Sequence, residues 1–306
     1  MGRMKKLAWT LVVWPLACGS ESDPTMVEVR DVRVPVPAAD PAYYDVVAPE
    51  LTIQPGEEKM ACFHLASPAE EIAVDFLDTE QGPFGHHVVM LSPKEPQPDG
   101  TLEDCTDAAD MSKYRTLILP ETEIPDGYAV RVPPRTPMVF QFHYVNTGLK
   151  PLLVRDYARL HKIPMANVSN WATTMGTTSA RFKLPADGKE VIETFDCVIP
   201  HDIDVLVLGG HMHEHGAWMK IEMGADAENL DLMYDVEKWV ADYRDAPPVE
   251  LYLTNPRRVA AGSILRTTCA WKNLGDKELA YPEEMCAAFG YTAGNEEQIQ
   301  CEVSAD

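Results

Sequence analysis

Five of the nine histidines in this 306-residue chain stand in patterns that could bind metal. His86 and His87 are adjacent within FGHHVVM, and His211 and His213 are two residues apart within GGHMHEHG. His143 lies between these two groups, in QFHY. Imidazole is the commonest protein ligand of transition metals. The placement of the five therefore predicts two mononuclear metal sites, one in each half of the chain.

The two pairs need different backbone geometry. Alternate residues of a β-strand point to the same side, so His211 and His213 can share one metal. Adjacent residues point to opposite sides, so His86 and His87 need a bulge, a strong twist or coordination through the proximal ring nitrogen. The irregular segment before them, GPFG at 82–85, would allow this. His143, on an alternating run, could complete a three-histidine site. Taken singly, these residues could also be turn and core histidines.

The second pair supplies only two ligands, and Met285 is the candidate for the third. It stands in a Glu-Met-Cys sequence at 284–286, and its thioether is a soft ligand that favours Cu(I) over zinc. The chain has 14 methionines, most of which we expect to pack in the core. Spacing alone does not select Met285, but a methionine ligand would make the second site a copper site.

The N-terminus predicts export. Arg3, Lys5 and Lys6 precede an apolar stretch at 7–16, which is too short to span a bilayer but fits a signal peptide. PLACGS at 15–20 resembles a bacterial lipoprotein cleavage box. We therefore expect a signal peptide at 1–17, a lipid on Cys18, and a lipid-anchored tether or irregular first strand at 18–40. An ordinary secretory signal is the alternative, and both predict an exported protein. With the lipid, we expect it in the bacterial cell envelope, facing the periplasm or the surface.

The charge of the chain excludes some partners. Asp and Glu number 48 against 26 Lys and Arg, which gives a net charge of −22. Nucleic acids and anionic lipid surfaces bind through basic patches, so neither is an expected partner. Any membrane association would come from the lipid on Cys18.

Six cysteines remain when Cys18 is set aside, and an even number in an exported chain predicts three disulfides. Six cysteines allow about fifteen connectivities, among which the sequence cannot choose. No Cys-x-x-Cys pair occurs, so a zinc ribbon or a thioredoxin-like motif is unsupported.

The pattern of short apolar runs and Pro/Gly turns predicts an all-β chain built of sandwiches or barrels. A break near Ile163-Pro164 divides it into domains at 41–163 and 164–306, with two of the ligand sets on each side. The 25 prolines argue against helical bundles. The expected strands lie at 59–65, 71–77, 86–91, 128–132, 138–145, 180–184, 191–198, 204–208, 218–223 and 249–253.

In this order, the sequences His-His, Gln-x-His-Tyr, His-x-His-x-x-Gly and Glu-Met-Cys resemble the type II copper, ascorbate-dependent monooxygenases. This is the group of the peptidylglycine α-hydroxylating and dopamine β-monooxygenases, of which the chain would be a bacterial lipoprotein member. The resemblance runs from about residue 59 to residue 301 and includes the cysteines. It implies the pairs Cys62–Cys105, Cys197–Cys301 and Cys269–Cys286.

The resemblance also implies a fold and a chemistry. The fold is two tandem jelly-roll β-sandwiches that face each other across a cleft, with two coppers per chain. His86, His87 and His143 would bind an electron-transfer copper, whereas His211, His213 and Met285 would bind the copper that meets dioxygen and substrate. Gln141 would lie close to the first site and the substrate. The reaction implied is hydroxylation of a C–H bond of a small organic substrate by O2, with two electrons from ascorbate or another one-electron reductant.

Three positions depart from the peptide-amidating enzyme. Gly209 replaces an arginine that helps to bind the substrate carboxylate, and Ala287 and Phe289 replace an asparagine and a tyrosine. The loss of these polar groups argues against peptide amidation and favours a hydrophobic or phenolic substrate.

The other histidines have no ligand pattern. His215 is extra to the second pair, with a supporting or surface role expected, and His64, His161 and His201 are expected to be structural. Two other function classes remain open. One is an exported copper-binding or sensing protein without turnover. The other is a zinc hydrolase that uses Glu214, which would leave Met285 unexplained.

Overall fold

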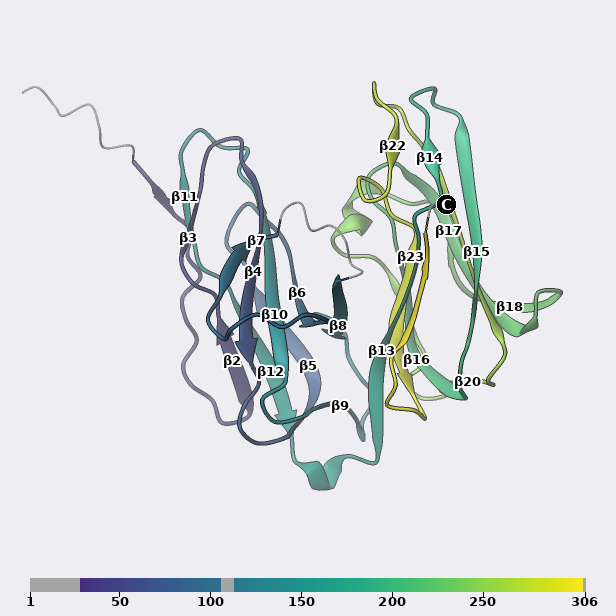
Figure 1. Cartoon of the computed structure of the whole chain (residues 1–306), viewed down its shortest axis with the longest axis horizontal. Coiled ribbons are helices and arrows are strands. Elements are labelled where there is room, and N and C mark those ends of the chain that lie inside the picture. Colours follow the sequence, from purple (N-terminus) through teal and green to yellow (C-terminus); the bar gives the residue numbers. More distant parts are fainter. Residues whose placement is uncertain (1–27, 106–112, 305–306) are drawn as a thin grey trace, which may run out of the picture.

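A computed structural model describes residues 28–105 and 113–304. The predicted signal peptide and the lipid site at Cys18 lie outside the described residues. The described chain is all-β, as predicted, with sheets stacked in a sandwich-like arrangement (Figure 1). None of its helices is long and apolar enough to cross a membrane.

The strands of the first half, residues 28–163, are β1 (Arg30–Asp31), β2 (Tyr43–Val47), β3 (Leu51–Ile53), β4 (Glu58–Ala66), β5 (Ile72–Glu80), β6 (Gly85–Pro93), β7 (Leu102–Asp104), β8 (Tyr114–Ile118), β9 (Tyr128–Val132), β10 (Pro137–Val145), β11 (Leu152–Val154) and β12 (Tyr157–Ile163). The second half, residues 164–304, contains η2 (Met165–Asn167), β13 (Asn170–Ser179), β14 (Lys183–Leu184), β15 (Glu190–Val198), β16 (Ile203–His211), β17 (Gly216–Asp226), β18 (Asn229–Val236), η3 (Ala241–Arg244), β19 (Val249–Leu251), β20 (Arg257–Val259), β21 (Ile264–Lys272), β22 (Leu279–Ala280), β23 (Ala287–Ala293) and β24 (Ile299–Val303).

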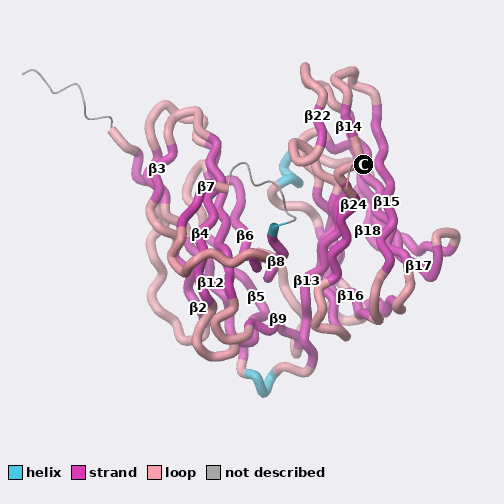
Figure 2. The backbone as a smooth tube through the Cα atoms, in the orientation of Figure 1, coloured by secondary structure: helices cyan, strands magenta, loops and turns pink. Residues whose placement is uncertain are grey.

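Each half packs a sheet of its own against part of one long shared sheet. The first half contributes the sheet β7-β4-β10-β6-β8, and the second contributes β15-β21-β17-β18. The shared sheet runs β19-β16-β23-β13-β9-β5-β12-β2 and crosses between the halves where β13 pairs in parallel with β9. The two halves stand side by side and meet at this pairing, near the short helix η2 (Figures 1 and 2). The connection at 163–164 is thus a turn within a continuous sheet.

Alternation on the strands sends ligand residues to the outside of each core. On β10, Met138, Phe140, Phe142 and Tyr144 enter the core of the first half, so His143 faces the opposite side of the sheet. Leu208 on β16 and Met212 just after it enter the core of the second half, which leaves His211 on the face with Val207.

That face of β16 packs against the first half, because Val207 belongs to the first core although it lies in the second half. Tyr291 of β23 reaches across in the same way, where its hydroxyl accepts a hydrogen bond from the backbone N–H of Leu119 at 2.6 Å. The second histidine pair therefore lies on the side of its sheet that faces the first half.

Three disulfides cross-link the chain, and they are the pairs that the resemblance implies: Cys62–Cys105, Cys197–Cys301 and Cys269–Cys286. Three structural disulfides indicate an oxidising compartment outside the cytoplasm.

The expected tether is structured where it is described. Residues 30–31 pair with β11, and Val32 and Val34 are buried against the first half. The irregular first strand, which the sequence left open beside the tether, is what forms over this part of 18–40.

Candidate metal centres

A bulge at His86 brings three imidazoles together in the first half. On the ladder between β10 and β6, His143 pairs with His87 but Tyr144 pairs with Gly85, so His86 is an extra residue. The ring centroids of His86 and His87 lie 5.1 and 5.0 Å from that of His143. One ligand nitrogen from each ring lies within 4.8 Å of the others. The sequence required a bulge for this pair to share a metal, and the structure has one.

The segment before the bulge is shaped for it. Phe84 has a φ of 73°, which is unusual for a residue with a side chain. A Cβ on Gly82 would lie 2.2 Å from the backbone oxygen of Val32, so only glycine fits. The GPFG sequence thus turns the chain sharply just before the two histidines.

His143 has one nitrogen engaged and one free. Its Nε2 lies 3.0 Å from a carboxylate oxygen of Glu58, while its Nδ1 is buried without a hydrogen-bond partner. A buried polar atom without a partner costs free energy unless something binds it. A metal ion at the three-histidine cluster would satisfy Nδ1, and the carboxylate on Nε2 would hold the ring in place.

A buried network supports the backbone of this site from behind. The side-chain amide of Gln81 donates to the carbonyls of His87 and His143 at 3.3 and 3.1 Å. It also donates to Asp156, whose other carboxylate oxygen accepts from the hydroxyl of Tyr144 at 2.5 Å. Burial raises the pKa of Asp156 to about 6, although hydrogen bonds from Tyr144 and Gln81 oppose the rise.

The second pair lies where β16 ends. The ring centroids of His211 and His213 are 5.1 Å apart and nearly perpendicular. His213 Nδ1 donates to the backbone oxygen of Glu283 at 2.9 Å, which leaves its Nε2 for a metal.

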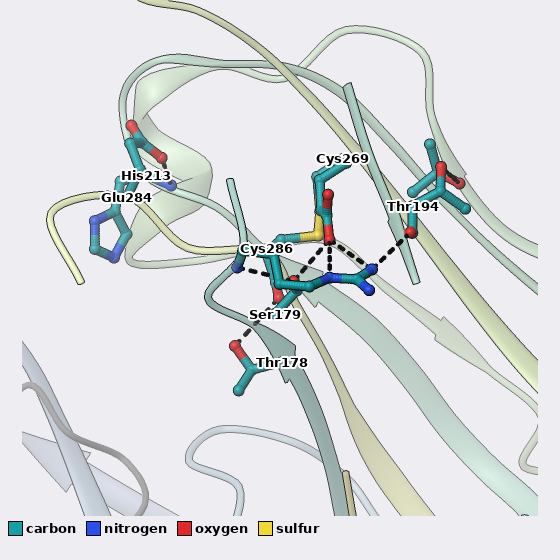
Figure 3. Close-up of a disulfide and its surroundings, with 10 residues drawn as sticks. Thr178, Ser179, Thr194, His213, Cys269, Glu284 and Cys286 are labelled. Atoms are coloured by element: carbon teal, nitrogen blue, oxygen red, sulfur yellow. Dashed lines mark hydrogen bonds and ion pairs between the residues drawn. A yellow bond between two sulfur atoms is a disulfide. The ribbon is translucent and has the colours of Figure 1, made fainter. Parts of the chain in front are cut away.

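A buried carboxylate shapes the turn that carries His213. Glu284 is fully buried, and its two oxygens accept from the backbone N–H groups of His213 and His215 at 3.0 and 2.8 Å. Figure 3 shows Glu284 beside His213, with the Cys269–Cys286 disulfide nearby. The sequence singled out the Glu-Met-Cys segment but gave Glu284 no role.

Met285 is held between two fixed neighbours. Glu284 binds the histidine turn, and Cys286 is cross-linked to Cys269 on β21. The backbone of Met285 is therefore confined beside His213, and its side chain is half-buried.

The surroundings of His143, His211 and His213 favour their neutral imidazoles. Burial, with help from the neighbouring His87, lowers the pKa of His143 to about 4. Burial and the neighbouring His213 lower the pKa of His211 to about 3, and burial also lowers the pKa of His213. Only a neutral imidazole binds a metal, so no proton has to be displaced near neutral pH.

Gln141 shares the outer face of β10 with His143 but contacts a disulfide. Its side-chain nitrogen lies 3.6 Å from Cys62 Sγ and 3.8 Å from Cys105 Sγ, and the residue is buried. A catalytic role for Gln141 stays a prediction.

Gly209 and Phe289, two of the departures noted above, form a cross-strand pair next to His211. A Cβ on Gly209 would lie 2.6 Å from the ring of Phe289 and 3.0 Å from Val249. The phenyl ring thus fills the space over Gly209, and the third departure, Ala287, pairs with His211 itself. At Gly209, where the peptide-amidating enzyme has an arginine, the surroundings of His211 are therefore apolar.

Two residues at the end of η3 connect the two sites. The guanidinium of Arg244 binds the carboxylate of Glu214, which lies between His213 and His215. The next residue, Asp245, places Oδ1 3.0 Å from His86 Nδ1 and 3.9 Å from His87 Nδ1. In Figure 2, η3 is the cyan turn on the side of the second half that faces the first.

Two of the remaining histidines pair with carboxylates. His64 pairs with Glu103 at 2.8 Å and His161 with Asp75 at 2.6 Å. His215 donates its backbone N–H to Glu284, and its carbonyl accepts from the backbone N–H of Lys272 at 2.9 Å. The buried Nε2 of His201 has no hydrogen-bond partner among the described residues, and a structural role for that residue stays a prediction.

Gln81, Glu58, Glu284 and Asp245 support the two sites, and the sequence predicted a role for none of them. Of these four, only Glu284 could have been found from the sequence, because it adjoins the predicted ligand Met285. The others lie in unrelated segments that meet the histidines through strand pairing and the contact between the halves.

Comparison with known proteins gives no relative in sequence: no protein-family model and no curated protein matches the chain. Among solved structures, the chain is similar to dimeric latent PorU from Porphyromonas gingivalis, with 10% identity over 78% of this chain and a TM-score of 0.19. It spans 24% of that chain. It is also similar to the structure of infectious bursal disease virus, Gx strain, with 9% identity, 82% and 72% of the two chains covered, and a TM-score of 0.20. Such superpositions are too poor to support an argument.

Proposed function

We propose that the chain is a copper-dependent monooxygenase that hydroxylates a C–H bond of a small organic substrate with O2. In this proposal the halves are two tandem jelly-roll domains, each with one copper. The observation that carries it is the convergence of His86, His87 and His143 through a strand bulge, with a buried nitrogen of His143 left without a partner.

The ligand sets suit copper in different ways. Three imidazoles would hold an ion in the first half, whereas His211, His213 and the thioether of Met285 would hold one in the second. When bound, the copper ions would supply one-electron chemistry and the activation of dioxygen, and a thioether favours the reduced ion. Ascorbate or another one-electron donor would provide the two electrons that the reaction needs.

The chain's own residues would position these ligands. Glu58 orients the ring of His143, Gln81 fixes the backbone of His87 and His143, and Glu284 fixes the turn of His213. Phe289 and Val249, which meet over Gly209, would present an apolar surface to the substrate. This favours a hydrophobic or phenolic molecule and disfavours peptide amidation, which needs a cation for the substrate carboxylate.

Metal stoichiometry is the first test. We expect two copper ions per chain, and about one in either His143→Ala or His213→Ala. His161→Ala, which changes a histidine paired to Asp75 away from both clusters, should leave two. Zinc bound in preference to copper, or a stoichiometry that these substitutions do not change, would overturn the proposal.

Turnover is the second test. Copper-loaded protein with ascorbate and a panel of small aromatic and aliphatic substrates should consume O2 and yield hydroxylated product, and Met285→Ala should abolish this. If both coppers bind but no oxygen is consumed above free copper, the chain is a copper-binding protein of the cell envelope without turnover.

A further inference from the structure

We propose that Asp245, from the second half, is an acidic partner of the first metal site and biases that site toward the oxidised ion. The inference rests on the proposed function, because it requires a metal at His86, His87 and His143. It adds a residue from the opposite half to a site whose three histidines all come from one sheet.

The geometry of Asp245 is that of a group belonging to the site. Its Oδ1 lies 3.0 Å from His86 Nδ1 and 3.9 Å from His87 Nδ1, so a single oxygen faces both rings. Two ligand atoms on one tetrahedral ion are about 3.3 Å apart when the bonds are about 2.0–2.1 Å long. The two distances bracket that value. Whether the oxygen binds the ion or an imidazole N–H, its negative charge lies at the metal site.

Asp245 is a carboxylate that lies among nitrogen-bearing side chains of both halves. Its Oδ1 lies within hydrogen-bond distance of His86 Nδ1, and the guanidinium of the adjacent residue, Arg244, is bound to Glu214 beside His213. The facing groups on the first half are His86 and His87, with Glu58 bound to the far nitrogen of His143.

A carboxylate beside a copper ion stabilises Cu(II) more than Cu(I). The oxidised ion carries one more positive charge, and an oxygen anion suits a harder ion than the soft Cu(I). Because Asp245 comes from the segment that also contacts the second site, this effect exists only while the halves are in contact.

The test isolates the first site by using a His213→Ala background and compares Asp245→Asn with Asp242→Asn. Both substitutions remove one acidic charge from an exposed residue of the same segment, but in the described part of the chain only Asp245 of the two has a hydrogen bond or ion pair with the histidines. Cu(II) and Cu(I) affinities are measured by competition with chromophoric chelators of each ion. Thermal unfolding of the metal-free proteins checks that the variants fold alike.

We expect Asp245→Asn to weaken Cu(II) binding about tenfold, the lower end of the effect of losing a metal-site partner. Cu(I) binding should change less than threefold. A tenfold selective loss corresponds to a rise of about 59 mV in reduction potential. Asp245→Glu should recover part of the Cu(II) affinity, and the Cu(II) paramagnetic resonance spectrum should differ between Asp245→Asn and Asp242→Asn.

Equal Cu(II) affinities and equal spectra for Asp245→Asn and Asp242→Asn would overturn the inference and leave the proposed function intact. The copper content of His213→Ala is also compared with that of the double variant His143→Ala/His213→Ala. If the second substitution removes no copper, the first metal site does not exist. In that case the proposed function and the inference are both overturned.

Discussion

The two histidine sites are held together by different parts of the structure. The first is assembled on neighbouring paired strands, where ladder register and one bulge fix all three imidazoles. The second has His211 at the end of a strand, His213 in the following turn and Met285 in a separate loop. The carboxylate of Glu284, the backbone oxygen of Glu283 and the Cys269–Cys286 disulfide fix these segments relative to one another. The difference teaches that a site on a sheet shares its support among many backbone bonds, while a site on loops can depend on one buried group.

The largest effect should follow Glu284→Ala, which removes the support of the second site. Two backbone N–H groups lose a buried, charged acceptor, at about 1–3 kcal/mol each, so the free energy of unfolding should fall by about 2–6 kcal/mol. Copper should fall from two to about one per chain. Urea denaturation and metal analysis measure these changes, with the exposed Glu283→Ala as the control. Retention of both ions in Glu284→Ala would show that the turn holds its shape without the carboxylate.

Acid should weaken the metal-free protein through both sites. Burial lowers the pKa of His143 to about 4, so between pH 6.5 and 4 the unfolded chain binds a proton that the folded chain does not. Stability therefore rises with pH in this window, and the loss at pH 4 from His143, which is 2% exposed, is about 3 kcal/mol.

Replacing His143 or His211 by glutamine should flatten this pH dependence, as measured by urea denaturation between pH 7 and 4. Other titrating groups, such as Asp156, are common to all the proteins and cancel in the comparison. An unchanged slope in His143→Gln would mean that the buried ring can be protonated without unfolding. If the free energy of unfolding depends less steeply on pH in only one of the two variants, the histidine replaced in that variant is the one whose burial opposes protonation.

Tyr144→Phe should weaken the first site without touching the second. It removes the hydroxyl that donates to Asp156 and accepts from Gly82 N–H at 3.1 Å, at a cost of about 2 kcal/mol. Copper affinity should fall at the first site only. The matched control is Tyr291→Phe, which also removes a buried hydroxyl, at Leu119, but lies away from the network behind His87 and His143. Equal losses of copper affinity in the two variants would contradict a specific role for the network.

The smallest effect concerns the apolar surroundings of the second site. Gly209→Ala places a methyl group against the ring of Phe289 and should cost about 1–2 kcal/mol. Phe289→Ala opens that space, so the double variant should lose less than the sum of the single losses, with a coupling of about 1 kcal/mol by denaturation. Strict additivity would show that the ring moves aside freely.

Much of the fold followed from alternation and turn residues. The strand at 128–132 has the predicted bounds, and the runs at 59–65 and 138–145 are extended by one or two residues. The run at 180–184 gave only Lys183–Leu184. The strand β13, with the sequence NWATTMGTTS, was missed because it has no apolar alternation. It lies inside the shared sheet, with β23 paired on one edge and β9 on the other.

The candidate site was predictable as far as its ligand types. Residue chemistry selected His86, His87, His143, His211, His213 and Met285, and the adjacency of the first pair required a bulge, which the structure has at His86. Spacing could not indicate which nitrogen of His143 is free, because that depends on Glu58, which comes from another strand.

By itself, the sequence determined which side chains can bind metal, which strands alternate, and how many disulfides an exported chain with six further cysteines can form. These properties depend on residue type and on local periodicity. Only the tertiary structure decided that the shared sheet joins the halves, that Glu284 holds the histidine turn, and that Asp245 meets His86. Each of these contacts joins segments at least 40 residues apart, and pairing over such distances is set by packing of the whole chain, which local sequence does not encode.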